Sequence, residues 1–113
     1  MKLTEIVKEL DLTILVEANL EEKNVQGVYI CDLLSNVMAH GHEGNLWITV
    51  QTHQNILAVA SLLNFSAIIL PEGLTPEQAV LEKASEGQIP ILQSAQGVFE
   101  LAGKLYEMGL RGN

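Results

Sequence analysis

Short apolar runs and helical repeats alternate along the chain, and their order predicts its secondary structure. Runs rich in β-branched and other apolar residues predict strands at 12–16, 25–32, 46–50, 66–70 and 89–93. Apolar residues spaced three or four apart predict helices over 3–10, 33–38, 55–64, 75–87 and 94–108. The apolar run at 46–50 suits a strand covered on both faces. The nearly all-apolar helix at 55–64 is expected to be deeply buried.

Polar residues at the expected helix starts indicate how the first turns are capped. Thr4 stands at the start of the first helix, and Ser94 stands before the last. Thr75 is followed by Pro76 at the first helical position and by Gln78 three residues after the cap, a strong start signal. We therefore expect all three hydroxyl side chains to cap helices.

The order of the elements predicts the fold class. From residue 25 onward strands and helices alternate, with connections of two to six residues. Such alternation is typical of a parallel sheet wrapped by helices through right-handed crossovers. A chain of 113 residues is long enough for one core and too short for two. We predict a single α/β domain over 1–113, with a mostly parallel five-stranded sheet flanked by helices.

The composition narrows the functional classes. Apolar residues make up 48% of the chain, which favours a folded domain over a disordered one. With 14 acidic and 6 basic residues the net charge is -8, so the surface repels nucleic-acid phosphates and anionic lipids. The longest apolar run, 56–65, is too short to span a bilayer, and the first residues show no signal peptide. We expect a cytoplasmic protein that binds neither nucleic acid nor membrane.

Candidate metal ligands are few and far apart. Cys31 is the only cysteine, which excludes an internal disulfide, and its apolar run predicts a buried, unreactive thiol. His40, His42 and Glu43 are acceptable zinc ligands, but they enter the third strand at its amino end. His53 leaves that strand at its carboxyl end, so five or six residues at about 3.3 Å each separate the two groups by roughly 20 Å. We predict no metal and no cofactor.

A binding site is expected beyond the carboxyl ends of the strands, where open parallel sheets bind ligands. Polar residues follow four strands at this edge, namely Asp32 with Ser35, then Gln51 to Asn55, then Glu72, then Gln93 with Ser94. The second group is the densest, and the helix after it is expected to offer unpaired N–H groups and a positive dipole end. The predicted ligand-binding residues are Asp32, Ser35, Gln51, Thr52, His53 and Asn55.

These residues also have a structural interpretation. Asp32, Thr52 or Asn55 could each simply cap a helix. His53 is harder to explain in this way, because an imidazole is neither a favoured cap nor a good core residue, although a lone loop histidine is usually solvated. The chain lacks the glycine-rich phosphate loop, the nucleophile elbow and the dinucleotide fingerprint, so we predict that it is not an enzyme. The alternative is an enzyme that uses His53 as base, oriented by Asp32.

Three segments carry a resemblance to a known family. They are VQGVYICDLLSNVM (25–38), LWITVQTHQNILAVASL (46–62), and IPIL (89–92) followed by FELAGKLYEMGL (99–110). With them the chain resembles a stand-alone DRTGG-domain protein over nearly its whole length. The motif that names this family is poorly kept, because its Asp-Arg falls on Glu22-Lys23 and its Thr-Gly-Gly on Gln26-Gly27-Val28. Only Gly27 matches, so no role of that Thr or of the second Gly carries over.

The resemblance implies a fold and a class of function. The family is similar to the amino-terminal domain of HPr kinase/phosphorylase, which implies an α/β fold. The catalytic domain of that kinase has a phosphate-binding loop, and this chain has none. Related DRTGG domains sit beside nucleotide-sensing CBS modules in some pyrophosphatases and within some phosphotransacetylases.

Two non-catalytic functions follow from this resemblance. One is a regulatory domain that senses a ligand, with an adenine nucleotide as the candidate. No Lys or Arg lies near the predicted site in sequence, so phosphates would depend on backbone amides or Mg²⁺. The other is an interaction module, such as an accessory subunit of a metabolic or redox complex.

Excess apolar surface predicts that the chain forms a homodimer. A domain of 113 residues has little room to cover both faces of its sheet and also bury a helix as apolar as 56–63. The last helix adds Phe99, Tyr106 and Leu110 beside its inward face. A two-fold dimer is the commonest way to bury such an excess, with completion of the monomer core as the alternative.

Overall fold

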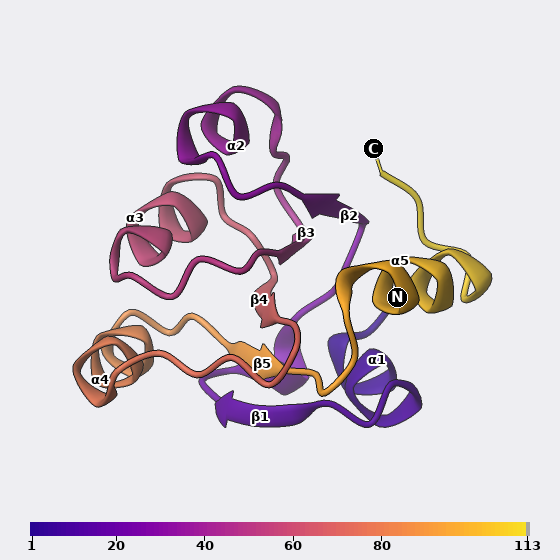
Figure 1. Ribbon diagram of the computed structural model, residues 1–113, viewed down its shortest axis with the longest axis horizontal. Helices are drawn as coiled ribbons and strands as arrows, with labels where there is room; N and C mark the ends of the chain where they lie inside the picture. The colour runs from indigo at the N-terminus through magenta and orange to yellow at the C-terminus, as the bar shows by residue number, and fades with distance from the viewer. Residues whose placement is uncertain (113) are drawn as a thin grey trace.

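The computed structural model describes residues 1–112 and shows a five-stranded sheet with helices on both faces (Figure 1). The strands are β1 (Thr13–Val16), β2 (Gly27–Ile30), β3 (Asn45–Ile48), β4 (Ala67–Leu70) and β5 (Ile91–Gln93). The helices are α1 (Leu3–Glu9), α2 (Leu34–His40), α3 (Asn55–Leu62), α4 (Gln78–Glu86), α5 (Val98–Glu107) and the 3₁₀ turn η1 (Leu20–Glu22). Every strand and helix predicted from the hydrophobic pattern is present, with ends that differ by a few residues.

The sheet has the order β1-β5-β4-β3-β2 and is mostly parallel, as predicted. Strands β2 to β5 run parallel, in a register that pairs Val28 with Leu46 and Ile69 with Leu92. Only β1 runs antiparallel, pairing Thr13 with Gln93 at the outer side of β5. The central strands β3 and β4 are buried at every position, because helices cover both of their faces.

The side chains of successive strand residues point alternately into two hydrophobic cores. Leu46 and Ile48 of β3 join the core under α1 and α5, which includes Leu101. Trp47, between them, joins the core under α2, α3 and α4, where its ring meets Phe65 edge-on at 5.6 Å. In Figure 1 these two helical layers lie on opposite sides of the strands. The packing explains why β3 and β4 are apolar on both faces.

Two predicted helix caps are wrong. Thr4 lies inside α1, whose N-cap is Lys2, and no side chain caps that helix. Helix α5 begins after Gly97 rather than after Ser94. The Ser94 hydroxyl instead accepts a hydrogen bond from the backbone N–H of Gln96 at 3.0 Å. It therefore stabilises a turn that precedes the helix.

The predicted start of α4 is also displaced. The helix begins at Gln78 with Glu77 as its N-cap residue, so Thr75 is too far upstream to cap it. The Thr75 hydroxyl accepts a hydrogen bond from the Gln93 side-chain amide at 2.6 Å instead. A contact to the end of the neighbouring strand has replaced the local cap, which sequence spacing alone could not show.

Some residues expected in the interior are exposed. Helix α3 buries Ile56 and Ala60, but Leu62 is 73% exposed, so the prediction of deep burial all round is wrong. This helix belongs to the outer layer between α2 and α4, and no element of residues 1–112 covers its far side (Figure 1). Cys31 is half-buried rather than buried. Among the helices of residues 1–112, none is long and apolar enough to cross a membrane.

Candidate functional site

The carboxyl ends of β2, β3, β4 and β5 define one edge of the sheet, called here the carboxyl edge. The connection from β3 to α3 supplies most of its polar groups. The structure brings Gln51 of this connection to Asp32, since the Gln51 side-chain amide donates to the Asp32 carbonyl oxygen at 3.0 Å. Two of the predicted residues, far apart in sequence, are thus neighbours.

Asp32 connects two strand ends. Its carboxylate oxygen Oδ1 accepts hydrogen bonds from the Thr49 hydroxyl and from the backbone N–H of Val50, each at 2.9 Å. It does not cap α2, whose N-cap is Leu33 without a side-chain bond. Hydrogen bonds to a charged acceptor are the stronger kind. The geometry therefore assigns Asp32 a positioning role that fixes the β3–α3 connection.

His53 contributes to the start of α3. Its Nδ1 accepts a hydrogen bond from the backbone N–H of Asn55 at 3.2 Å, and neither Thr52 nor Asn55 provides a side-chain cap. The imidazole thus takes the role that the sequence analysis gave to its neighbours. An accepting Nδ1 in a neutral ring leaves the proton on Nε2. The Nε2–H group has no partner within residues 1–112 and is available as a donor.

The start of α3 has few free amides, contrary to the expectation from sequence. The N–H of Ile56 bonds to the His53 carbonyl at 3.1 Å, and that of Leu57 bonds to the Gln54 carbonyl at 3.0 Å. The N–H of Asn55 is already bonded to the imidazole of His53. A phosphate at this helix end would have to displace these bonds.

A pocket of about 270 Å³ lies between the β3–α3 connection and the start of α4. Its lining consists of Thr52, His53, Gln54, Thr75, Glu77, Ala79 and Val80. The side chain of Glu77 makes no capping hydrogen bond, so its carboxylate is available as an acceptor. Thr75 and Glu77 were missed as site residues, because the sequence assigned the segment 75–78 to a helix start alone. The signal for them is the adjacency of β3 and β4, which places the connections after them side by side.

The other predicted residues lie outside this pocket. Ser35 is exposed on α2 and makes no hydrogen bond within the described part of the chain. Asn55 lines a separate hollow of about 390 Å³ between α3 and α4. The backbone N–H of Glu72 donates to the Gln96 carbonyl at 2.9 Å, and the Gln93 amide bonds to the carbonyl of Leu74 at 2.9 Å. Of the predicted ligand-binding residues, only Thr52 and His53 line the pocket.

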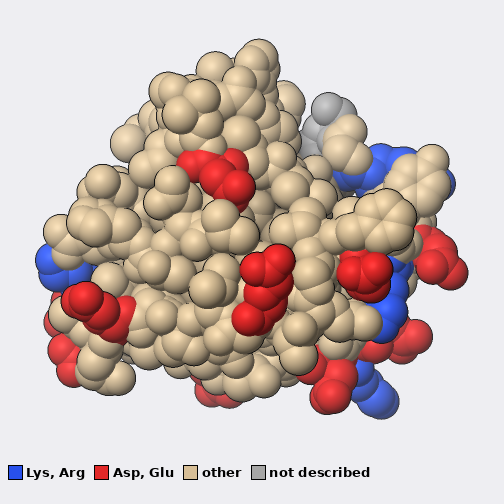
Figure 2. Space-filling model, viewed as in Figure 1, with Lys and Arg blue, Asp and Glu red and all other residues tan. Residues whose placement is uncertain are grey.

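The fold also places a cation beside Gln54, in the neighbouring hollow between α3 and α4, and the sequence did not reveal this contact. Lys83 of α4 donates from its ammonium to the Gln54 side-chain oxygen at 2.7 Å. The two residues are 29 positions apart, so only the packing of α4 beside α3 makes them neighbours. In the view of Figure 2, Lys and Arg atoms lie toward the margins of the molecule, and acidic side chains lie at separate places across it.

The arrangement required for a histidine base is not formed. Asp32 bonds to Thr49 and Val50, while His53 Nδ1 bonds to its own helix start, so Asp32 does not orient the imidazole. Within residues 1–112, no group of three His, Cys, Asp or Glu side chains is placed to hold a metal ion. The side chains that line the pocket can form hydrogen bonds through hydroxyl, imidazole and carboxylate groups.

Comparison with known proteins gives a family match and a structural neighbour. The model of the DRTGG domain family matches residues 5–108. A crystal structure of the CBS and DRTGG domains of the regulatory region of Clostridium perfringens pyrophosphatase, complexed with its activator diadenosine tetraphosphate, superposes with a TM-score of 0.67. The match covers 90% of this chain and 44% of that one at 18% identity, which shows a shared fold. No curated protein sequence matches the chain.

Proposed function

The chain belongs to the DRTGG domain family, and we propose that it is a non-catalytic regulatory domain that binds a small ligand at its carboxyl edge. The observation that carries this proposal is the pocket of about 270 Å³ in which Thr52, His53 and Glu77 converge from two connections. Open α/β sheets bind ligands at this edge. The regulatory region of the pyrophosphatase provides a family precedent for control by a ligand.

The lining of the pocket favours the nucleoside part of an adenine nucleotide. Glu77 can accept hydrogen bonds from ribose hydroxyls or an amino group, and the Nε2–H of His53 can donate to a ring nitrogen. Val80 offers an apolar surface to a base. At about 270 Å³ the pocket lies just below the range of about 300–1,000 Å³ typical of small-molecule sites, which suits one nucleoside.

Phosphate groups of such a ligand would extend toward the rim. Lys83 lies beyond Gln54, to which its ammonium donates at 2.7 Å, in the neighbouring hollow between α3 and α4. The amides of α3 are already bonded, so a bound phosphate would depend on Lys83 or on Mg²⁺. Nucleosides and monophosphates are therefore expected to bind with less dependence on Mg²⁺ than triphosphates.

Calorimetric titration with adenosine, AMP and ATP, with and without Mg²⁺, tests this proposal. Glu77→Gln removes the charged acceptor in the pocket and is expected to weaken binding at least tenfold. Glu86→Gln is the matched control, because it makes the same change at the exposed far end of α4. Absence of binding at millimolar concentration, or equal losses in both variants, would contradict the nucleoside site.

A pure interaction function is the second candidate. The exposed apolar side chains of Ile30, Leu33 and Val50 lie next to Asp32 at the same edge, with exposed fractions of 42%, 66% and 41%. Such a patch suits a protein surface as well as a ligand. Affinity capture from the native cytoplasm tests this reading, since recovery of the chain without a stoichiometric partner would count against an accessory subunit of a metabolic or redox complex.

The proposal includes a cellular setting and self-association. A net charge of -8 and one half-buried thiol suit a reducing cytoplasm without a nucleic-acid or membrane partner. We also propose that the chain is related to the amino-terminal domain of HPr kinase/phosphorylase. We also propose a homodimer, because α5 leaves large aromatic side chains exposed.

A further inference from the structure

Gln93, the last residue of β5, bonds to the connection that follows the neighbouring strand β4. Its side-chain nitrogen Nε2 lies 3.2 Å from the carbonyl oxygen of Gly73 and 2.9 Å from that of Leu74. It also lies 2.6 Å from the hydroxyl oxygen of Thr75. Two of the three acceptors are carbonyl groups, which cannot donate, so the atom that faces them is the amide nitrogen rather than the amide oxygen. One side chain thus binds three consecutive residues of the β4–α4 connection.

Backbone hydrogen bonds hold the same connection independently of the Gln93 side chain. The N–H of Glu72 donates to the Gln96 carbonyl at 2.9 Å, and the N–H of Gly73 donates to the Ser94 carbonyl at 2.8 Å. Loss of the Gln93 amide would therefore leave the path of the backbone in place. It would act mainly on the side chain that this amide contacts.

The contact with Gln93 determines how the Thr75 hydroxyl can be used. A hydroxyl has one proton to donate, while its oxygen accepts. The oxygen accepts from Gln93, so the proton points to another partner. The acceptor for it within residues 1–112 is the Gly73 carbonyl oxygen at 3.5 Å, whereas a good O–H···O bond is about 2.5–3.0 Å long. The proton is therefore open to a better acceptor, and Thr75 lines the pocket at the carboxyl edge.

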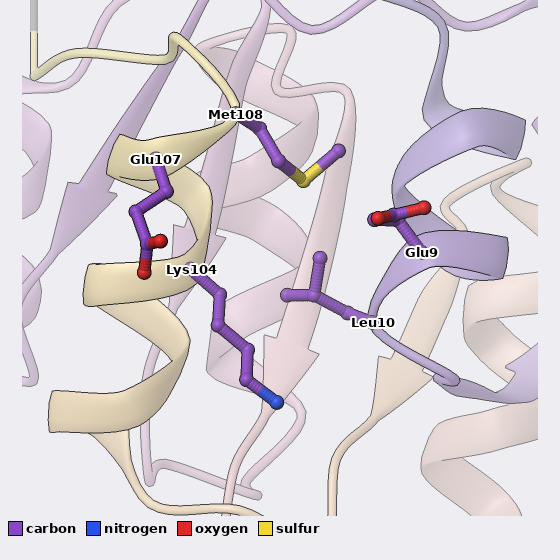
Figure 3. Close-up of a pocket in the computed structure, with 5 residues that line it drawn as sticks. All are labelled: Glu9, Leu10, Lys104, Glu107 and Met108. Atoms are coloured by element: carbon purple, nitrogen blue, oxygen red, sulfur yellow. The ribbon is translucent and has the colours of Figure 1, made fainter.

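A larger hollow elsewhere shows that volume alone does not make such a site. It measures about 370 Å³ and lies between α5 and α1 (Figure 3). Its lining consists of Glu9, Leu10, Lys104, Glu107 and Met108. Within residues 1–112, none of its three charged side chains forms a hydrogen bond or an ion pair, so each would lose rotamer freedom on binding a ligand. The Thr75 hydroxyl is already held by Gln93.

We infer that Gln93 is a positioning residue of the pocket, and that it fixes the Thr75 hydroxyl as a hydrogen-bond donor to the ligand. The ligand must then present an acceptor to Thr75. With the Nε2–H of His53 as a donor and the Glu77 carboxylate as an acceptor, the pocket suits a ring that combines acceptors with a donor. Adenine does so through its ring nitrogens N1 and N7 and its 6-amino group. This inference rests on the proposed nucleoside site.

Two substitutions separate the hydroxyl of Thr75 from its methyl group. Thr75→Val keeps the methyl group and the shape of the side chain, and it should weaken adenosine binding about fivefold to tenfold in calorimetric titration. Thr75→Ser keeps the hydroxyl and should bind adenosine within about twofold of the wild type. The reverse ranking would mean that the methyl group faces the ligand, and it would overturn the inference.

Gln93→Met removes the amide and keeps a side chain of similar length. We expect adenosine to bind about threefold to fivefold more weakly, because the hydroxyl then has to be oriented on binding. Combined with Thr75→Val it should cause no further loss, since no hydroxyl is left to orient. A loss that adds fully to that of Thr75→Val would indicate a structural role alone and would refute the positioning role.

Gln88→Met is the matched control for Gln93→Met. The Gln88 amide also donates to a backbone carbonyl, that of Ser85 at 3.2 Å, but it lies outside the pocket. Its replacement should leave adenosine affinity unchanged. An equal loss in both variants would show that Gln93 has no specific role at the pocket.

Adenosine analogues distinguish failure of this inference from failure of the nucleoside site. 7-Deazaadenosine and 1-deazaadenosine each have C–H in place of one ring nitrogen and so lack one acceptor. The wild type should bind one of them at least about fivefold more weakly than adenosine, and Thr75→Val should bind that analogue and adenosine equally. If adenosine binding depends on Glu77 but no analogue is discriminated through Thr75, the roles of Gln93 and Thr75 alone are refuted. If the wild type binds no nucleoside at millimolar concentration, the proposed site is refuted together with them.

Discussion

The two edges of the sheet differ in how completely their polar groups are used. At the amino edge, where β2 to β5 begin, the buried hydroxyl of Ser66 donates to the carbonyl oxygens of Asn24 and Gly44, and the Asn64 amide bonds to Glu43 at 3.0 Å. At the carboxyl edge, His53 Nε2 and the Glu77 carboxylate stay without a partner among the described residues. The bonds named at the first edge join the starts of the strands, whereas the two unbonded groups at the second line the pocket.

Residues 22–28, on which the resemblance places the family motif, lie at the amino edge. Glu22, Lys23 and Gln26 line a small hollow there of about 150 Å³, with Gly44 and Ser66. Its floor is built from backbone carbonyls that already accept hydrogen bonds. In this chain the motif positions therefore contribute to the junction of β2, β3 and β4, and the candidate site lies at the opposite edge.

The largest expected effect is at the amino edge. A Cβ atom on Gly41 would lie 2.5 Å from the Phe65 ring and 2.9 Å from the Val37 carbonyl oxygen. Gly41→Ala is therefore expected to lower the free energy of unfolding by about 2–3 kcal/mol, as overpacking does. Urea denaturation measures this loss. Gly103→Ala is the control, because its Cβ meets nothing within 4 Å, and it should be neutral or stabilising.

Ser66→Ala is expected to have the next largest effect. It leaves the carbonyl oxygens of Asn24 and Gly44 without this donor in a site where Ser66 is only 4% exposed. The loss should be about 1–2 kcal/mol in the free energy of unfolding. Binding of nucleosides at the carboxyl edge should be unchanged once the protein is folded. A loss of affinity without a loss of stability would mean that the amino edge holds the ligand.

Asp32→Ala tests whether Asp32 holds the β3–α3 connection in place at the carboxyl edge. It removes the acceptor of the Thr49 hydroxyl and the Val50 N–H, each bonded at 2.9 Å. Asp32 is exposed, so water can replace part of these bonds, and we expect a loss of about 1 kcal/mol in stability. Ligand affinity should fall as well, because the β3–α3 connection becomes mobile. Hydrogen exchange at residues 49–55 reports that mobility, and unchanged protection there would refute the positioning role.

The sequence predicted the elements and the fold class well, because apolar periodicity records burial directly. The runs at 46–50 and 66–70 are apolar on both faces for the reason that the structure confirms, since helices cover β3 and β4 on each side. Local capping was predicted poorly. Several polar side chains lie near each helix start. Thr75, for example, accepts a hydrogen bond from Gln93 of the next strand instead of capping its own helix.

For a similar reason, only part of the candidate site could be predicted from the sequence. Thr52 and His53 follow an apolar strand, which is a local signal, and both line the pocket. Glu77 lines the same pocket and Lys83 bonds to Gln54 of its lining because α4 packs beside α3, over separations that no local pattern encodes. Long-range register decides such partners, so they appear only once the sheet order is known.

The smallest expected change in stability separates the two roles of His53. Its Nδ1 accepts from the N–H two residues ahead, at 3.2 Å, which is the bond that an Asn or Asp side chain makes in an Asx-turn. His53→Asn should therefore retain this bond and change the free energy of unfolding by less than about 0.5 kcal/mol. It removes the imidazole Nε2–H from the pocket, so nucleoside affinity should fall by roughly tenfold, the value of one hydrogen bond to a buried polar partner.

His40→Asn is the control, because His40 is exposed at the end of α2 and borders neither the pocket nor its walls. Urea denaturation and calorimetric titration of both variants give the comparison. Full affinity in His53→Asn would show that the imidazole serves α3 alone, and the polar groups of Thr52 and Glu77 would then have to account for any ligand.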